Sequence, residues 1–136
     1  MNAPREEDWI HEHPFQLNTS DGYTIHGIQN EVPFEDRNNE AVILCHGLTG
    51  NPYEHILQSG RRYLNREGYD VLRFGFYGNQ PDARKLKHCT LADHAHDLLQ
   101  VVAFARQKYG KIYVCGHSYG GTAALIANPD VAGISF

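Results

Sequence analysis

A serine with one glycine two positions before it and another two positions after it, Gly116-His117-Ser118-Tyr119-Gly120, most constrains what this chain can fold into. An apolar run at Lys111–Cys115 precedes the motif and a run of small residues at Tyr119–Ala127 follows it. This order predicts a strand, a sharp turn and a helix. Side chains in place of the two glycines would collide in such a turn. The turn would lift the Ser118 hydroxyl above the sheet edge and point free N–H groups of the helix toward it.

Apolar runs alternate with helical patterns along the rest of the chain. Asp21-Gly22 lies between the alternating runs Phe15–Ser20 and Tyr23–Gln29, which predicts a hairpin. The continuous apolar run Ala41–Cys45 is typical of a strand buried on both faces of a parallel sheet. Further strands are expected at 69–76, 111–115 and 131–136. Helices are expected from Pro52 to about Arg66, from the Thr90 cap to a stop at Gly110, and at 119–127. The order predicts an α/β fold: a mostly parallel sheet with an N-terminal antiparallel hairpin.

Terminal signals set the expected helix boundaries. Asn51-Pro52 offers an N-cap and a suitable first helical residue, and Glu54 lies near the positive end of the helix dipole. Gly68 is expected to end this helix in the left-handed conformation. Thr90, with Asp93 three residues later, predicts a capping box at the start of the next helix.

A second glycine loop, His46-Gly47-Leu48-Thr49-Gly50, follows the apolar run at 41–45. Acyl transfer at Ser118 would need a backbone N–H from a strand-to-helix loop, and Leu48 is the natural donor. The N–H groups of Leu48 and Tyr119 would then converge on a substrate oxyanion, each worth roughly a hundredfold in rate. The alternative is an ordinary glycine loop in which His46 is a hydrogen-bonded polar residue.

Together these motifs and the order of elements resemble an α/β-hydrolase, in particular the serine aminopeptidase, lysophospholipase and feruloyl-esterase-like group. The resemblance runs from about Phe15 to the end of the chain. It implies that Ser118 is the nucleophile and that the N–H groups of Leu48 and Tyr119 form the oxyanion hole. The residues expected to support the two turns are His46, Gly47, Gly116, His117 and Gly120. One segment departs from the family: residues 74–79 read FGFYGN, where an Asp and an Arg often precede a Gly.

The resemblance also implies that the catalytic acid and histidine follow the seventh and eighth strands, beyond these 136 residues. A complete domain of this class has about 250 residues. We therefore expect a polar leader at 1–14 and the N-terminal half of a single domain at 15–136, truncated in its sixth strand, Val131–Phe136. Because a serine hydroxyl needs an adjacent base at neutral pH, Ser118 in this chain alone should be nearly inert.

The leading interpretation is a serine hydrolase that cleaves a small-molecule ester, thioester or amide through an acyl-enzyme and needs no cofactor. The alternative is a non-catalytic remnant or a module that binds an acyl ligand or a protein. No metal site is expected, because neither His11-Glu12-His13 nor the pair His94 and His96 has useful ligand spacing.

Charge and composition restrict the partners and the cellular location that we expect. The net charge of -4 arises from scattered acidic and basic residues with no basic stripe, which argues against nucleic acid as a partner. The leader lacks an apolar segment and no later stretch has the length of a membrane span, so we expect a cytoplasmic protein. The three cysteines are expected to be reduced. The sequence leaves the oligomeric state open.

Overall fold

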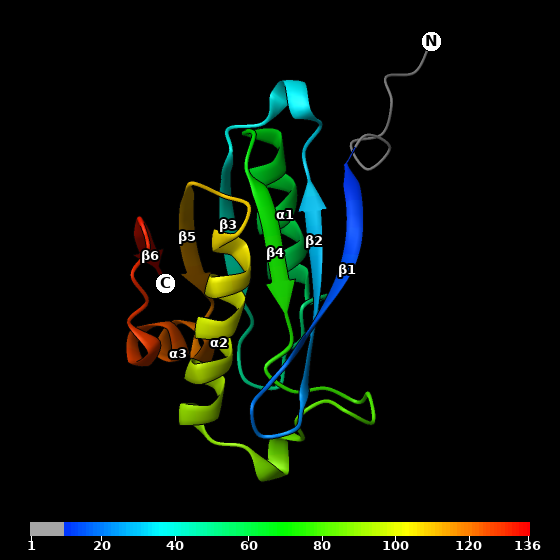
Figure 1. Cartoon of the computed structure of the whole chain (residues 1–136), viewed down its shortest axis with the longest axis vertical. Helices are drawn as coiled ribbons and strands as arrows, with labels where there is room; N and C mark the ends of the chain where they lie inside the picture. The colour runs from blue at the N-terminus through cyan, green and yellow to red at the C-terminus, as the bar shows by residue number, and fades with distance from the viewer. Residues whose placement is uncertain (1–9) are drawn as a thin grey trace.

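The computed structural model describes residues 10–136, and a single six-stranded sheet forms its centre (Figure 1). The strand order is β1-β2-β4-β3-β5-β6. The strands are β1 (His11–Asn18), β2 (Thr24–Glu31), β3 (Glu40–Cys45), β4 (Asp70–Phe74), β5 (Lys111–Gly116) and β6 (Gly133–Ser135). β2 pairs antiparallel with both β1 and β4, whereas the β4-β3-β5-β6 pairs are all parallel. The predicted fold class is confirmed.

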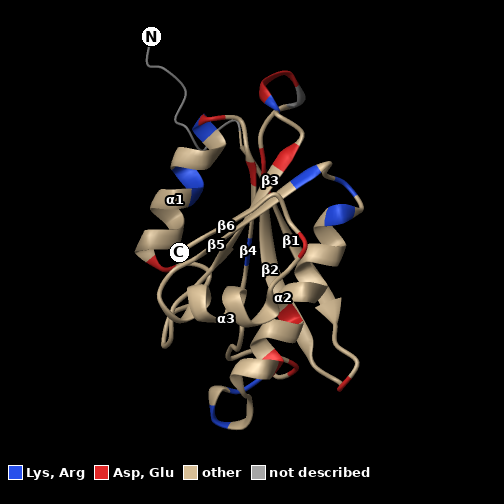
Figure 2. Cartoon of the chain, turned by 90° about the vertical axis from the view of Figure 1, so that its left-hand side faces the viewer, with Lys and Arg blue, Asp and Glu red and all other residues tan. Residues whose placement is uncertain are grey.

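Helices cover both faces of the sheet (Figures 1 and 2). α1 (His55–Arg66) lies on one face, and α2 (Leu91–Arg106) and α3 (Tyr119–Ala127) lie on the other. Short 3-10 turns at Phe34–Asp36 and Leu86–His88 lie in the connecting loops.

The core explains why β3 is apolar without alternation. Ile43 of β3 pairs with Leu72 of β4 and with Val114 of β5, and all three side chains are buried. Leu98 from α2 packs in the same cluster. On the opposite face, Leu57 of α1 packs with a smaller apolar set. A strand with helices on both sides buries every side chain, so the run 41–45 contains only apolar residues.

Two helix signals behave as predicted. Thr90 caps α2 with its side chain while the Asp93 carboxylate accepts the N–H of Thr90, which completes the capping box. Gly68 has φ +92°, in the left-handed region expected after a helix. Its position therefore favours glycine.

The expected start of α1 was wrong. The helix begins at His55 rather than at Pro52, and its N-cap is Glu54 rather than Asn51, with no side-chain capping bond. The Asn51 side chain instead accepts the N–H of Tyr53 at 2.8 Å, which closes a local turn before the helix. Asparagine is prone to such turns because its side chain competes with the helical backbone pattern.

Several strands also begin or end at residues other than those predicted. β1 begins at His11 rather than at residue 15, because its pairing with β2 extends to Glu31. β4 ends at Phe74 rather than at residue 76, and β6 spans only Gly133–Ser135 of the expected 131–136.

Surface and membrane features are simple over the described part of the chain. Acidic and basic residues are interspersed along helices and loops (Figure 2). Within residues 10–136, no helix has the length and apolar character needed to cross a bilayer. All three cysteines are free thiols.

Candidate active site

Ser118 lies at the junction of β5 and α3 in an unusual backbone conformation. Its φ of 53° and ψ of -112° place a non-glycine residue in a strained region. Such strain costs about 1–3 kcal/mol and persists only where surrounding contacts hold it. Three backbone hydrogen bonds do so: His117 N–H to Cys45 O, Gly120 N–H to His117 O, and Gly121 N–H to Ser118 O, each at 2.9 Å. The strand-turn-helix geometry expected from the motif is present.

The two motif glycines allow the turn to pack closely. A Cβ at Gly116 would overlap the backbone of Gly121 at the start of α3. A Cβ at Gly120 would overlap the carbonyl oxygen of Cys45, at the end of β3. The second glycine therefore brings α3 against the strand that leads into the loop carrying Leu48.

His46 is a buried link between two loops. Its Nδ1–H donates to Gly47 O at 2.8 Å, and its Nε2 accepts the N–H of Phe76 at 3.0 Å. Both ring nitrogens are thus engaged by the backbone, which fixes the neutral tautomer. Burial lowers the pKa of this imidazole. His46 therefore links the loop after β3 to the segment after β4 and has no free nitrogen for proton transfer.

Glu54 connects the two motifs, a role that the sequence did not indicate. Its Oε1 accepts the N–H of Gly47 at 3.3 Å and lies 3.5 Å from Nδ1 of His117. The loop between them turns sharply, with Gly50 N–H donating to Gly47 O at 3.0 Å and Thr49 at φ 63°. One carboxylate therefore bridges the loop that carries Leu48 and the turn that carries Ser118.

A second unpredicted group anchors Tyr119. Nδ1 of His94 is hydrogen-bonded to the Tyr119 hydroxyl, and Nε2 lies 2.9 Å from Sγ of Cys89. His94 is 1% exposed, and burial lowers its pKa to about 4. Burial also raises the pKa of the Cys89 thiol. A neutral imidazole donates through one ring nitrogen and accepts through the other, so His94 donates to one of these two partners and accepts from the other.

The sequence placed His94 and His96 on different helix faces, and the structure agrees. His94 points inward, whereas the side chain of His96 is half exposed. The contact between His94 and Tyr119 had no sequence signal, since it joins two helices through tertiary packing. Grouped His, Cys, Asp or Glu side chains able to hold a metal ion are absent from residues 10–136.

The imidazoles nearest to Ser118 already have partners. His46 is bonded to two backbone groups, His94 to Tyr119 and Cys89, and His117 to Glu54. A general base must hold its nitrogen within hydrogen-bond reach of the serine hydroxyl. His46 and His94 have both ring nitrogens engaged by these partners, whereas His117 is half exposed and only its Nδ1 faces a carboxylate, that of Glu54.

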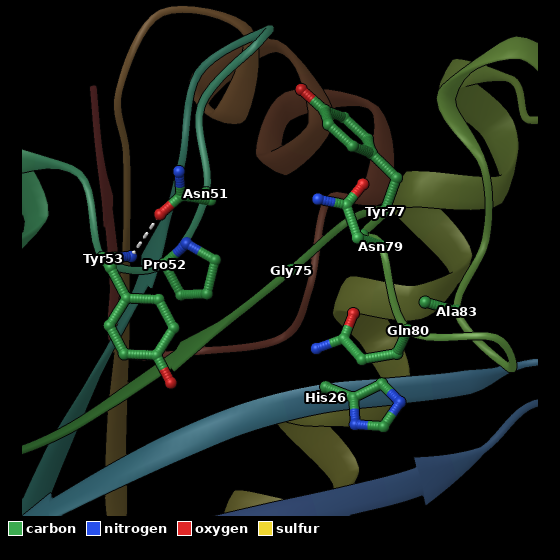
Figure 3. Close-up of a pocket in the computed structure, with 10 residues that line it drawn as sticks. His26, Asn51, Pro52, Tyr53, Gly75, Tyr77, Asn79, Gln80 and Ala83 are labelled. Carbon is green, nitrogen blue, oxygen red and sulfur yellow. Dashed lines mark hydrogen bonds between the residues drawn. The ribbon is translucent and has the colours of Figure 1, made fainter.

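A cavity of about 520 Å³ opens beside this site, between the turn before α1 and the loop after β4 (Figure 3). Tyr77, Asn79 and Gln80 line one side of it, and Asn51 and Tyr53 the other. His26 from β2 contributes to its floor. The loop 47–50 continues directly into this lining through Asn51.

Comparison with known proteins identifies the fold family of this chain. Residues 40–128 match the family described as alpha/beta hydrolase fold. The match includes both glycine motifs and covers more than half of the chain. The chain belongs to the α/β-hydrolase fold family. A search of curated proteins finds no match.

Solved structures have the same fold. The Pyrococcus furiosus esterase Pf2001 is 24% identical, with a TM-score of 0.76 over 96% of this chain and 51% of its own. XC6422 from Xanthomonas campestris, described as an a/b serine hydrolase without lid, is 22% identical, with a TM-score of 0.69 over 92% of this chain and 60% of its own.

Est1E from Butyrivibrio proteoclasticus, solved with ferulic acid bound, is 26% identical. Its TM-score is 0.72 over 83% of this chain and 46% of its own. The chain therefore spans about half the length of these structural relatives.

Proposed function

We propose that this chain supplies the nucleophile and the oxyanion hole of a serine hydrolase acting on a small-molecule ester, thioester or amide. The strained conformation of Ser118 at the start of α3 carries this proposal. A serine with φ 53° costs free energy that a merely structural turn could avoid by using glycine. The turn presents the hydroxyl beside the first N–H groups of a helix.

In the proposed reaction, Ser118 Oγ attacks the substrate carbonyl carbon while a general base accepts the hydroxyl proton. The N–H groups of Leu48 and Tyr119 donate to the oxyanion of the tetrahedral intermediate. The intermediate collapses with protonation of the leaving group and leaves an acyl-enzyme. Water then attacks the acyl carbon and regenerates the free serine.

The general base and its acidic partner are proposed to come from sequence outside these 136 residues. His46 and His94 support this proposal because both ring nitrogens of each are already engaged by other groups. The serine aminopeptidase, lysophospholipase and feruloyl-esterase-like group is the proposed subgroup. The likeness to an esterase solved with ferulic acid is consistent with it.

Active-site labelling with a fluorophosphonate tests the proposal. The 136-residue chain and its Ser118→Ala variant are compared, each alone and each extended at the C-terminus to the length of its structural relatives. We expect labelling only in the extended chain that retains Ser118. Absence of labelling in that extended chain would favour the non-catalytic alternative. Serine-dependent labelling of the 136-residue chain would refute the external base.

A further inference from the structure

The cavity beside the site has a defined position relative to Ser118. It lies at the carboxyl end of β4, and β3 separates β4 from β5, which leads to Ser118. Adjacent strands are about 4.8 Å apart, so two strand spacings give about 10 Å. Both regions open at the same edge of the sheet, because parallel strands end there together. A substrate with its carbonyl at Ser118 could place another group in this cavity.

The residues that line the cavity include several polar side chains. The one imidazole among them, His26, is paired with a carboxylate. The amide groups of Asn79 and Gln80 face the cavity, and Asn51 lines its opposite side (Figure 3). Asn51 uses its oxygen to accept the N–H of Tyr53, which leaves its two N–H donors free for other partners. Nε2 of His26 lies 2.7 Å from a carboxylate oxygen of Asp82. That carboxylate is therefore already paired with the ring.

Apolar surfaces complete the walls. The tyrosine rings at positions 53 and 77, together with Pro52 and Ala83, line the same space. Aromatic faces beside amide groups suit a ligand that presents C–H surfaces and hydroxyl groups from one compact ring. The volume of about 520 Å³ lies within the roughly 300–1,000 Å³ typical of small-molecule sites.

We propose that this cavity binds a neutral, polyhydroxylated ring, such as a sugar residue, as the part of the substrate remote from the reacting carbonyl. A hydroxyl group both donates and accepts, and amides such as Asn79 and Gln80 can satisfy both roles. A hydrocarbon chain would offer these amides no hydrogen bond, so it would gain nothing from them. A charged ligand would find no unpaired counter-charge among the lining residues. The role in substrate recognition rests on the proposed function, whereas binding itself does not.

Nuclear magnetic resonance of the ¹⁵N-labelled chain tests binding without any need for catalysis. Methyl β-D-glucopyranoside is the neutral probe, glucuronate the charged one and n-hexanol the apolar one. We expect the glucoside to shift the side-chain amide signals of Asn79 and Gln80, and Ser118→Ala to leave that binding unchanged.

Asn79→Leu and Gln80→Leu are the diagnostic variants, and both side chains are exposed, so the fold should tolerate them. Each should weaken glucoside binding about tenfold. Gln107→Leu, an exposed amide removed at the C-terminal end of α2, is the matched control and should have no effect.

Three results would overturn the proposal: no response to the glucoside, stronger binding of glucuronate, or equal binding of hexanol at these amides. If the glucoside binds but the extended chain is not labelled by the fluorophosphonate, the cavity assignment stands and the hydrolase proposal fails.

Discussion

Acidification should destabilise the folded chain through His94. Its ring is 1% exposed, and burial lowers its pKa from the ordinary value of 6.5 to about 4. Between these two values the unfolded chain binds a proton that the folded chain does not bind. The stabilising effect of the neutral ring is therefore fully present above the unfolded value and is lost as the pH falls toward the folded value.

The size of the effect follows from the two pKa values. A full shift of this size corresponds to about 3 kcal/mol, and lowering the pH from about 7 to about 5 removes about 2 kcal/mol of it. The surrounding charges oppose one another. Asp93 favours the protonated ring, whereas Arg84 and His46 disfavour it. Desolvation is the largest contribution, so the direction is set by burial.

Urea unfolding followed by circular dichroism at several pH values measures this loss. His94→Gln removes the titrating ring and keeps a hydrogen-bonding side chain. Between about pH 7 and about pH 5, the unfolding free energy of this variant should therefore fall by about 2 kcal/mol less than that of the wild type. His96→Gln is the matched control, because that neighbouring ring is half exposed. His46 contributes in the same direction to every variant, and the comparison cancels it. Equal pH dependence in wild type and His94→Gln would refute this reasoning.

Three further changes test the packing around Ser118. Ser118→Gly should raise the unfolding free energy by about 1 kcal/mol relative to Ser118→Ala, because glycine relieves the φ of 53°; equal urea midpoints would show that the turn is unstrained. Gly120→Ala should destabilise the chain by about 1–3 kcal/mol or more, since its Cβ would overlap Cys45 O; an unchanged midpoint would argue against this close approach. Glu54→Ala should speed hydrogen exchange at the Gly47 N–H about tenfold, by removing its acceptor at 3.3 Å; equal exchange rates would mean that the carboxylate does not hold the loop.

The parts of the fold that could be predicted depend on local patterns. Apolar runs predicted the strands, and the capping box of Thr90 and Asp93 predicted the start of α2. Both predictions succeeded because each signal acts within a few residues. The predicted start of α1 was wrong, although its signal was also local. Asn51 fits both an N-cap and a local turn, and the turn formed because its side chain accepts the N–H of Tyr53.

The groups that support the site could not be found in this way. His94 meets Tyr119 across 25 residues, and that contact depends on how α2 packs against α3. Glu54 precedes α1 and His117 precedes α3, so their contact depends on how these two segments pack together. Neither pair has a spacing that signals contact, whereas the glycine motifs are contiguous in the sequence.

The supporting hydrogen bonds and the cavity use separate residues, and this separation has a physical consequence. His46, Glu54 and His94 fix the loops through bonds to backbone and buried groups. Asn79 and Gln80 lie outside that set, and both are exposed at the cavity. Changes in the supporting groups should therefore alter the geometry at Ser118, and changes in the exposed amides should alter only what the cavity binds. Stability and ligand choice can vary independently in such an arrangement, because rigid elements hold the reacting group while a loop selects the ligand.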